Sequence, residues 1–349
     1  MSVDVLVVGG GPVGLAAAIE ARLAGLSVTV LEPRPGPVDK ACGEGLMPGA
    51  VAALARIGVD PDGHELRGIR YVAGRRRADH LFATTSGRGV RRTTLHAALE
   101  ARARELGASL VGTRCGVISQ DDNGVTCGDV HARWLLACDG LHSHIRSQLA
   151  LDRRASRWQP RRFGLRRHFR VAPWSDLVEV HWGPHVEAYV TPVADDVVGI
   201  ALLCPPHTDF DATLAALPEL AAQVAGAPTI GTLRGAGPLR QTTSRRTAGR
   251  VRLVGDASGY VDALTGEGLR VGVAQAHAAI TTLPDDAAGA DVASSNAAYE
   301  RAWSAVTRDY RVLTSALVTT SATPLRRGIV PLAAAAPALY GAVVERLAR

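Results

Sequence analysis

The fold is decided by the opening stretch, Val3-Asp4-Val5-Leu6-Val7-Val8-Gly9-Gly10-Gly11-Pro12-Val13-Gly14. An apolar run with the character of a buried strand leads into a G-x-G-x-x-G turn, and a helical run from Leu15 to Ala24 follows it. In such a turn Gly9 permits a tight reversal, Gly11 lets the backbone approach a pyrophosphate, and Gly14 allows the helix to pack closely on the strand. The helix N-terminus offers free N–H groups to phosphates. The opening therefore predicts a dinucleotide site formed by Gly9, Gly11, Pro12, Val13 and Gly14.

The next predicted strand, Ser27 to Leu31, ends at an acidic residue. Glu32 stands where a carboxylate accepts hydrogen bonds from ribose hydroxyls, and its charge would repel a 2′-phosphate. FAD or NAD is therefore favoured over NADP at this site. We expect the residues that follow, Pro33 and Arg34, to lie beside the nucleotide as well.

Two later motifs also follow apolar strands. The first is Cys138-Asp139-Gly140-Leu141-His142-Ser143, and the second is Gly255-Asp256, with Gly266-Glu267-Gly268 opening a helix soon after it. With the opening turn, these motifs make the chain resemble the para-hydroxybenzoate hydroxylase superfamily of flavoproteins as far as about Ile280. That superfamily includes aromatic hydroxylases and geranylgeranyl-reductase-like enzymes.

The resemblance implies FAD bound in an extended form. Asp256 would contact the ribityl chain or the pyrophosphate, and a helix N-terminus near residue 268 would stabilise the anionic reduced flavin. An arginine at the start of another helix would reach the phosphates or the ribose; Arg92 is favoured and Arg91 is its rival. The cofactor residues expected from these motifs are Arg92, Asp139, Gly140, Gly255, Asp256, Gly266, Gly268 and Leu269.

A loop rich in proline and glycine, residues 33–48, contains Lys40-Ala41-Cys42-Gly43-Glu44-Gly45. This segment resembles the cysteine-glycine loop of geranylgeranyl-reductase-like enzymes, which implies that Cys42 and Gly43 lie close to the flavin ring. Cys42 is the candidate catalytic residue, either as a proton donor to a substrate carbanion or as a small polarizable wall of the pocket. The wall is the favoured interpretation.

The chain departs from both branches of the superfamily. Hydroxylases usually carry a proline three residues before the first glycine of the late loop, and this chain has Ala263 there. The substrate sheet of the reductases is rich in aromatic residues, whereas Ala188-Tyr189-Val190-Thr191-Pro192 holds one. The cysteine loop and the sheet therefore favour different reactions.

The apolar period changes to two between about Arg162 and Leu203, which predicts an antiparallel sheet above a ligand. The predicted fold class is α/β, with a Rossmann-type FAD-binding domain interleaved with an antiparallel-sheet substrate domain and followed by a helical tail. The FAD-binding domain is expected from residues 1–72, 90–155 and 245–283, the substrate domain from 73–89 and 156–244, and the C-terminal helices from 284–349. Histidines on or near the sheet, His168, His181 and His185, are candidates to face the pocket.

Composition narrows the class of protein further. Hydrophobic residues make up 47% and charged residues 21%, as in an ordinary globular protein. The net charge of +6 comes from dispersed arginines, with Lys40 the one lysine, so no nucleic-acid partner is expected. The five cysteines show neither disulfide-framework nor metal spacing, and no metal is expected. The N-terminus shows no leader peptide, so a cytoplasmic location is expected.

The apolar stretch Ile329 to Val344 is broken by Pro331 and Pro337. We interpret it as packed helices, with membrane contact the less favoured alternative.

Three functions remain open at this point. The leading hypothesis is a flavin monooxygenase that hydroxylates an aromatic or lipophilic small molecule, with NAD(P)H as a transient reductant. The second is a flavin-dependent reductase of carbon–carbon double bonds, with a proton supplied from the loop around Cys42. The third is a non-catalytic FAD-binding protein. The sequence identifies neither the substrate nor the oligomeric state.

Overall fold

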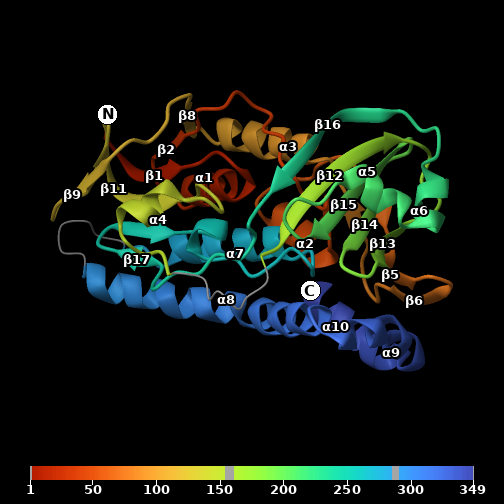
Figure 1. Cartoon of the computed structure of the whole chain (residues 1–349). Helices are drawn as coiled ribbons and strands as arrows, with labels where there is room; N and C mark the ends of the chain where they lie inside the picture. The colour runs from red at the N-terminus through yellow and green to blue at the C-terminus, as the bar shows by residue number, and fades with distance from the viewer. Residues whose placement is uncertain (1, 154–160, 285–290, 349) are drawn as a thin grey trace.

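Two large sheets and one small sheet organise the chain (Figure 1). The computed structural model describes residues 2–153, 161–284 and 291–348. The first sheet has the strand order β17 (Thr247–Ala248), β18 (Val251–Leu253), β11 (Val130–Ala137), β1 (Ser2–Val8), β2 (Val28–Leu31) and β8 (Ser109–Val111). Two further strands branch from it: β10 (Val125–Cys127) pairs with β11 and also with β9 (Ile118–Gln120). β1 is parallel to β2 and β11, and β18 is parallel to β11. The parallel core is therefore assembled from segments that lie far apart in the sequence.

Helices cover the first sheet because its strands are apolar on both faces. Val5 and Val7 of β1 point to one face, and Leu6 and Val8 point to the other. The first face packs against α1 (Pro12–Leu23), α2 (Pro48–Arg56), α3 (Arg92–Glu105) and α7 (Gly268–Thr281). The second face packs against the β9–β10 hairpin and against Ile145 of the short α4 (His144–Gln148).

The second sheet is antiparallel except at one pair of strands. Its order is β16 (Thr229–Ala236), β12 (Phe163–Arg170), β15 (Val197–Cys204), β14 (Glu187–Ala194), β13 (Leu177–Trp182), β5 (Gly68–Ala73) and β6 (Arg76–Leu81). One face is covered by α5 (Phe210–Ala215) and α6 (Pro218–Gln223), through Phe210, Leu214 and Leu220. The other face looks toward the first sheet and the C-terminal helices. A small sheet of β3 (Gly45–Leu46), β7 (Gly87–Gly89) and β4 (His64–Leu66) contacts α2 and strand β14 of the second sheet.

The C-terminal region is helical, as the sequence predicts. The long α8 (Val292–Ser321) packs on α7 and leads to the 3-10 helix η2 (Pro324–Gly328), α9 (Ile329–Ala335) and α10 (Pro337–Ala348), which lie against the second sheet (Figure 1). Among the described residues, no single helix is long and apolar enough to cross a membrane; the segments 324–335 and 337–348 pass that test as a pair, but they are bent by 103°.

Two details differ from the sequence-based expectations. The boundary expected at residue 72 falls inside β5, which pairs with β13 and β6 of the second sheet. Cys115 and Cys127 form a disulfide, with their Cα atoms 5.9 Å apart, although nothing in the cysteine spacing indicated one. The pairing arises because β9 runs antiparallel to β10 and returns the chain to Cys127, which lies opposite Ile118. Such proximity follows from the fold and carries no sequence signature.

Candidate functional site

The G-x-G-x-x-G turn has the geometry that its glycines predict. Gly9 has φ +102°, in the left-handed region, and a Cβ at Gly14 would lie 1.8 Å from the Gly9 carbonyl oxygen. Gly11 is different, because a Cβ there would meet one nearby atom, Arg92 Nη2, at 3.8 Å. The first and third glycines are required by packing within the protein, and the second borders the cavity described below.

Glu32 lies at the end of β2, beside this turn, as expected. Its carboxylate accepts hydrogen bonds from the Gly10 backbone N–H at 3.0 Å and from Arg34 Nε and Nη2 at 2.7 Å each. Burial alone would raise the pKa of Glu32, but the hydrogen bonds and charge of Arg34 outweigh burial and lower it. The carboxylate is therefore ionised at neutral pH and has Arg34 as its partner.

Arg92, the first residue of α3, carries an unpartnered buried guanidinium atom. The side chain is 8% exposed, and Nη1 has no hydrogen-bond partner among the described residues. Burial lowers the pKa of Arg92, and the opposing attraction of Cys42, Asp256 and Glu44 offsets this in part. Arg92 lines the cavity and its rival Arg91 does not, so the geometry favours Arg92 as the contact to an anionic ligand.

Lys40 and Asp256 extend the charged part of the site. Burial raises the pKa of Asp256, against the attraction of Lys40, Arg92 and Arg146. Burial also lowers the pKa of Lys40, and repulsion from Arg34 and Arg92 adds to this effect. The positive side chains of Lys40 and Arg92 therefore lie close enough to the Asp256 carboxylate to interact with it, which suits a diphosphate and a ribityl chain. Lys40 was not among the expected cofactor residues, because a single lysine in a loop gives no sequence signal.

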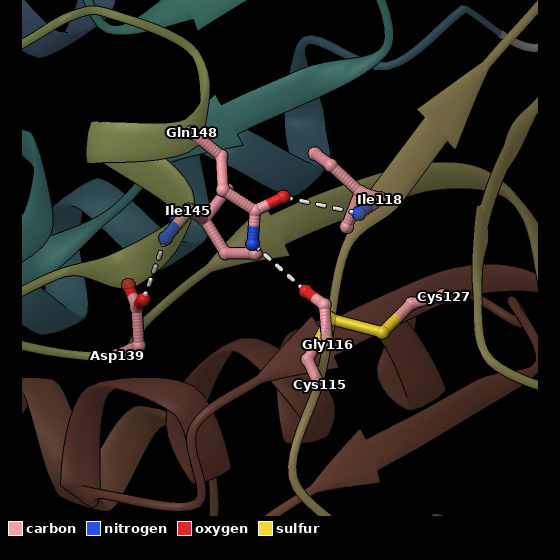
Figure 2. Close-up of a disulfide and its surroundings, with 7 residues drawn as sticks. All are labelled: Cys115, Gly116, Ile118, Cys127, Asp139, Ile145 and Gln148. Carbon is pink, nitrogen blue, oxygen red and sulfur yellow. Dashed lines mark hydrogen bonds between the residues drawn. A yellow bond between two sulfur atoms is a disulfide. The ribbon is translucent and has the colours of Figure 1, made fainter.

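Asp139 has a structural task that the sequence did not predict. Its Oδ2 accepts hydrogen bonds from the backbone N–H groups of His144 at 2.8 Å and Ile145 at 3.1 Å, at the start of α4. Figure 2 shows the bond from Ile145. Its buried Oδ1 has no hydrogen-bond partner within the described ranges. Gly140 lines the cavity, and Asp139 stabilises the turn through its hydrogen bonds to the start of α4.

The far end of α4 is held near the disulfide. Gln148 donates to the Gly116 carbonyl oxygen at 2.8 Å and accepts from the Ile118 N–H at 3.1 Å, beside the Cys115–Cys127 bridge (Figure 2). α4 therefore connects the disulfide-bonded loop to the Asp139–Gly140 turn.

One large cavity of about 890 Å³ runs from the glycine turn to the C-terminal helices. At one end it is bordered by the nucleotide motifs, including Pro12, Val13, Gly255 and Leu269. At the other end its walls are apolar side chains of the second sheet, of the end of α8 and of the helices that follow it, among them Ile69, Tyr71, Val178, Val180, Leu203, Leu317, Ile329, Tyr340, Val344 and Leu347. The cofactor motifs and a lipophilic chamber therefore share one continuous space.

The cysteine-glycine loop is fixed to the second sheet by a buried polar network. Glu44, with φ +60°, accepts from the Arg92 backbone N–H at 2.8 Å and pairs with His168 Nε2 at 2.5 Å. Arg166 contacts His168 Nδ1 at 3.0 Å and pairs with Asp39. Cys42 faces the cavity, and its sulfur accepts a hydrogen bond from the Glu44 N–H at 3.4 Å. Cys42 is exposed to the cavity. Partial desolvation by the surrounding residues raises the pKa of its thiol, so the thiol is protonated at neutral pH.

The three candidate histidines lie elsewhere. His168 is buried against Glu44, and His181 pairs with Glu179 at 3.0 Å. His185 is exposed between β13 and β14. Within the part of the chain that the structure describes, none of the three lines the cavity, so the expectation that one would face it is not supported.

The late loop, residues 263–267, leads directly into α7 and borders the cavity. Gly266, Gly268 and Leu269 all line the cavity, and Gly266 has φ +71°. Glu267 is 1% exposed and pairs with Arg270, while its Oε1 has no hydrogen-bond partner among the described residues. Burial raises the pKa of Glu267 to about 7, against the attraction of Arg270. The motif Gly266-Glu267-Gly268 gave no signal that the Glu267 side chain would be buried.

These residues fit FAD. The unpartnered Arg92 Nη1 needs an anionic acceptor, and the open face of Gly11 leaves room for the pyrophosphate. The N-terminus of α7 directs free N–H groups toward the part of the cavity that would hold the flavin. The fold and the site thus define a dinucleotide-binding flavoprotein.

Comparison with known families agrees with this class. Residues 2–310 match the family model described as "FAD binding domain", and the chain belongs to that family. Its resemblance to the para-hydroxybenzoate hydroxylase superfamily is confirmed.

Three curated relatives show how the match is distributed. Dialkyldecalin synthase of Streptomyces rugosporus is 28% identical over 303 residues, which is 79% of this chain and 64% of that protein. Menaquinone reductase of Mycobacterium tuberculosis is 34% identical over 163 residues, 42% of this chain and 40% of that protein. Rifampicin monooxygenase of Streptomyces venezuelae is 33% identical over 167 residues, 42% and 34% of the two chains. The chain thus spans less than two thirds of the length of each.

Solved structures confirm the α/β fold. The flavin-dependent brominase Bmp2 superposes with a TM-score of 0.84 at 16% identity, over 100% of this chain and 94% of that one. A geranylgeranyl bacteriochlorophyll reductase-like protein from Thermoplasma acidophilum gives 0.79 at 21% identity, over 95% and 90%.

Proposed function

We propose that the chain is an FAD-dependent monooxygenase that hydroxylates an aromatic or lipophilic small molecule. The observation that carries this proposal is the single cavity in which the cofactor motifs meet an apolar chamber. Curated relatives named rifampicin monooxygenase and anhydrotetracycline 6-monooxygenase support it. We also propose NAD(P)H as the reductant and retain the discontinuous domain division expected above, with β5 assigned to the substrate domain.

The proposed reaction consumes substrate, O₂, NAD(P)H and a proton, and it yields hydroxylated substrate, water and NAD(P)⁺. FAD, when bound and reduced, supplies the electrons that activate O₂ for transfer of one oxygen atom. Arg92 and the glycine turn hold the pyrophosphate, and the α7 N-terminus stabilises negative charge on the ring. The apolar walls exclude water and hold the substrate against the ring.

A second function, the reduction of a carbon–carbon double bond, is favoured by Cys42. Its thiol faces the cavity, and its raised pKa keeps a proton available for a substrate carbanion. The electrons would again come from FAD, and the products would be a saturated bond and oxidised cofactor. The relatives named menaquinone reductase support this alternative.

Isotope labelling separates these functions. The FAD-loaded protein is incubated with NADPH or NADH and, in turn, rifampicin, anhydrotetracycline and menaquinone, under ¹⁸O₂ or without oxygen. A product that carries ¹⁸O supports the monooxygenase. A product that gains two hydrogens without oxygen, and whose formation falls in Cys42→Ala, supports the reductase. FAD that is never reduced by either donor, with every probe unchanged, contradicts both and supports the non-catalytic alternative.

A further inference from the structure

The outer surface of the last helices is apolar to an unusual degree. Leu325, Leu332 and Leu339 are 70%, 61% and 58% exposed. We define the apolar face as these three leucines together with the exposed Ala334, Ala335, Ala338 and Ala342. Residues 328–344 carry no charged side chain. Exposed apolar side chains gathered on successive helices in this way are typical of a site of interaction.

The apolar face coincides with an opening of the cavity. Leu332, Ala336 and Leu339 line the cavity, and the two leucines are also more than half exposed. The inward sides of the same helices are buried, through Val330 in α9 and Tyr340 in α10. The chamber therefore reaches the protein surface between side chains that have no polar groups.

Arginines flank the apolar face. Arg75 is exposed at the turn between β5 and β6, and Arg76 and Arg77 are exposed at the start of β6. β6 packs on α9 and α10 through a cluster of Ala78, Ala333, Tyr340 and Val344. Arg327 is exposed in η2, directly before α9. An apolar helix surface with a cationic rim is complementary to a bilayer that bears anionic headgroups.

The helices are fixed in the orientation that presents this face. Arg326 of η2 pairs with the buried Glu187 of β14 and donates to the Gly183 carbonyl oxygen at 2.8 Å. The two apolar segments are bent by 103° relative to each other, and neither is long enough to cross a membrane as a single helix. In Figure 1, α9 and α10 form one edge of the molecule.

We propose that the apolar face docks on the surface of an anionic phospholipid bilayer, with α9 and α10 lying in the interface and the cavity mouth facing the lipid. A lipophilic substrate would then enter the cavity from the bilayer without crossing water. The inference goes beyond the proposed function, and its test requires no turnover.

Vesicle sedimentation with the full-length, FAD-loaded protein tests the proposal. We expect binding to vesicles of phosphatidylglycerol and phosphatidylcholine in equal parts, and weaker binding to phosphatidylcholine alone. The double variant Leu325→Glu/Leu332→Glu should bind at least roughly tenfold more weakly. Each of Arg75→Gln, Arg76→Gln and Arg77→Gln should weaken binding about fivefold, because one arginine near an anionic surface contributes about that factor. Val117→Glu is the matched control, since Val117 is 83% exposed and lies directly before strand β9 of the first sheet.

Three results would overturn the proposal: no sedimentation with anionic vesicles, sedimentation that the leucine variants leave unchanged, or equal loss in Val117→Glu. Light scattering identifies a different occupant. A dimer that the leucine variants convert to a monomer, without vesicle binding, would make the apolar face an interface between two copies of the chain.

Discussion

A buried positive charge without a partner is a strong indication of an anionic ligand at the scale of a single residue. Arg92 has lost most of its hydration, and its Nη1 finds no acceptor among the described residues. Leaving such a group unpaired is costly, whereas a pyrophosphate oxygen would satisfy it. The same side chain lies 3.8 Å from the position of a Cβ on Gly11, at the turn where phosphates bind.

We therefore expect Arg92→Ala to weaken FAD binding by about 10- to 100-fold, because a hydrogen bond to a charged group contributes about 1.5–3 kcal/mol. Quenching of flavin fluorescence on titration of the apoprotein measures the dissociation constant. Arg91→Ala is the matched control and should bind within about twofold of the unchanged protein. Equal losses in both variants, or a loss in Arg91→Ala alone, would contradict the assignment.

Glu267 gives a prediction about pH. Its pKa is about 7 in the folded protein, against 4.5 as the ordinary value, because burial penalises the ionised form. Between these two values the folded state binds more protons than the unfolded state, so this group lowers the free energy of unfolding as the pH rises from 4.5 to 7. The loss is on the order of 3 kcal/mol.

Glu267→Gln should remove this dependence. Urea unfolding of the apoprotein should show the variant gaining stability relative to the unchanged protein as pH rises through that window. Glu105→Gln, an exposed change on α3, should show no such trend. A stability difference for Glu267→Gln that is the same at pH 4.5 and pH 7 would contradict the raised pKa.

Residues that act through a local motif could be predicted from sequence, and residues that act through tertiary contact could not. Gly9, Gly11 and Gly14 are set by the strand and helix on either side of them. By contrast, the pair of Glu44 and His168 joins positions 124 residues apart, and it exists because the cysteine-glycine loop lies under the second sheet. No periodicity or spacing encodes that contact.

At the scale of elements, Arg252 links helices α7 and α8 to the first sheet through hydrogen bonds. It lies on β18, is fully buried, and donates to the Ala279 carbonyl oxygen at 2.6 Å, to Thr282 Oγ1 at 2.7 Å and to Ser295 Oγ at 2.5 Å. Its guanidinium also stacks between Trp134 and Tyr299. Burial lowers the pKa of Arg252 to about 10, although the charged form remains dominant at neutral pH.

Arg252→Met should lower the free energy of unfolding by about 3–5 kcal/mol, because the acceptors on α7 and α8 are left without their donor. Chemical denaturation measures the change. Arg301→Met, on the exposed side of α8, should cost less than about 0.5 kcal/mol. A cost for Arg252→Met no greater than for Arg301→Met would show that the helices are held by apolar packing alone.

The Cys115–Cys127 disulfide closes a loop with a sequence separation of 12. By the entropy of loop closure in the unfolded chain, Cys115→Ser/Cys127→Ser should lower stability by about 3 kcal/mol. Thermal unfolding with and without a reducing thiol checks this: the thiol should lower the melting temperature of the unchanged protein and leave that of the variant where it is. A thiol effect of equal size in both would assign it to another group.

Elements could be predicted where the pattern is local. The opening strand, turn and helix and the strands of β13 to β15 follow their apolar periods. The domain boundary expected at residue 72 falls inside β5, because no local pattern in residues 68–73 indicates which sheet they join. The pairing of β5 with β13 is a parallel contact between residues more than a hundred positions apart.

At the scale of the whole molecule, the first sheet is assembled from strands that lie far apart in the sequence. β1, β11 and β18 are neighbours in one sheet, although the second sheet's strands β12 to β16 occur between β11 and β18 in the sequence. The sequence motifs indicated this interleaving, because each nucleotide motif must end at the same edge of the first sheet. They could not indicate how the C-terminal helices close the cavity, since an apolar helix can pack against any apolar surface.

Because those helices form one wall of the cavity, the residues expected to contact the cofactor and the residues that shape the substrate chamber occupy different parts of the sequence. The residues proposed to hold the nucleotide all precede residue 270, whereas a full side of the lipophilic chamber comes from residues 317–348. Mutation or exchange of this last segment can therefore reshape the space for the substrate while the cofactor contacts stay intact. The architecture is suited to diversification: one redox core can acquire new substrates, in nature or in the laboratory, through changes confined to the final tenth of its sequence.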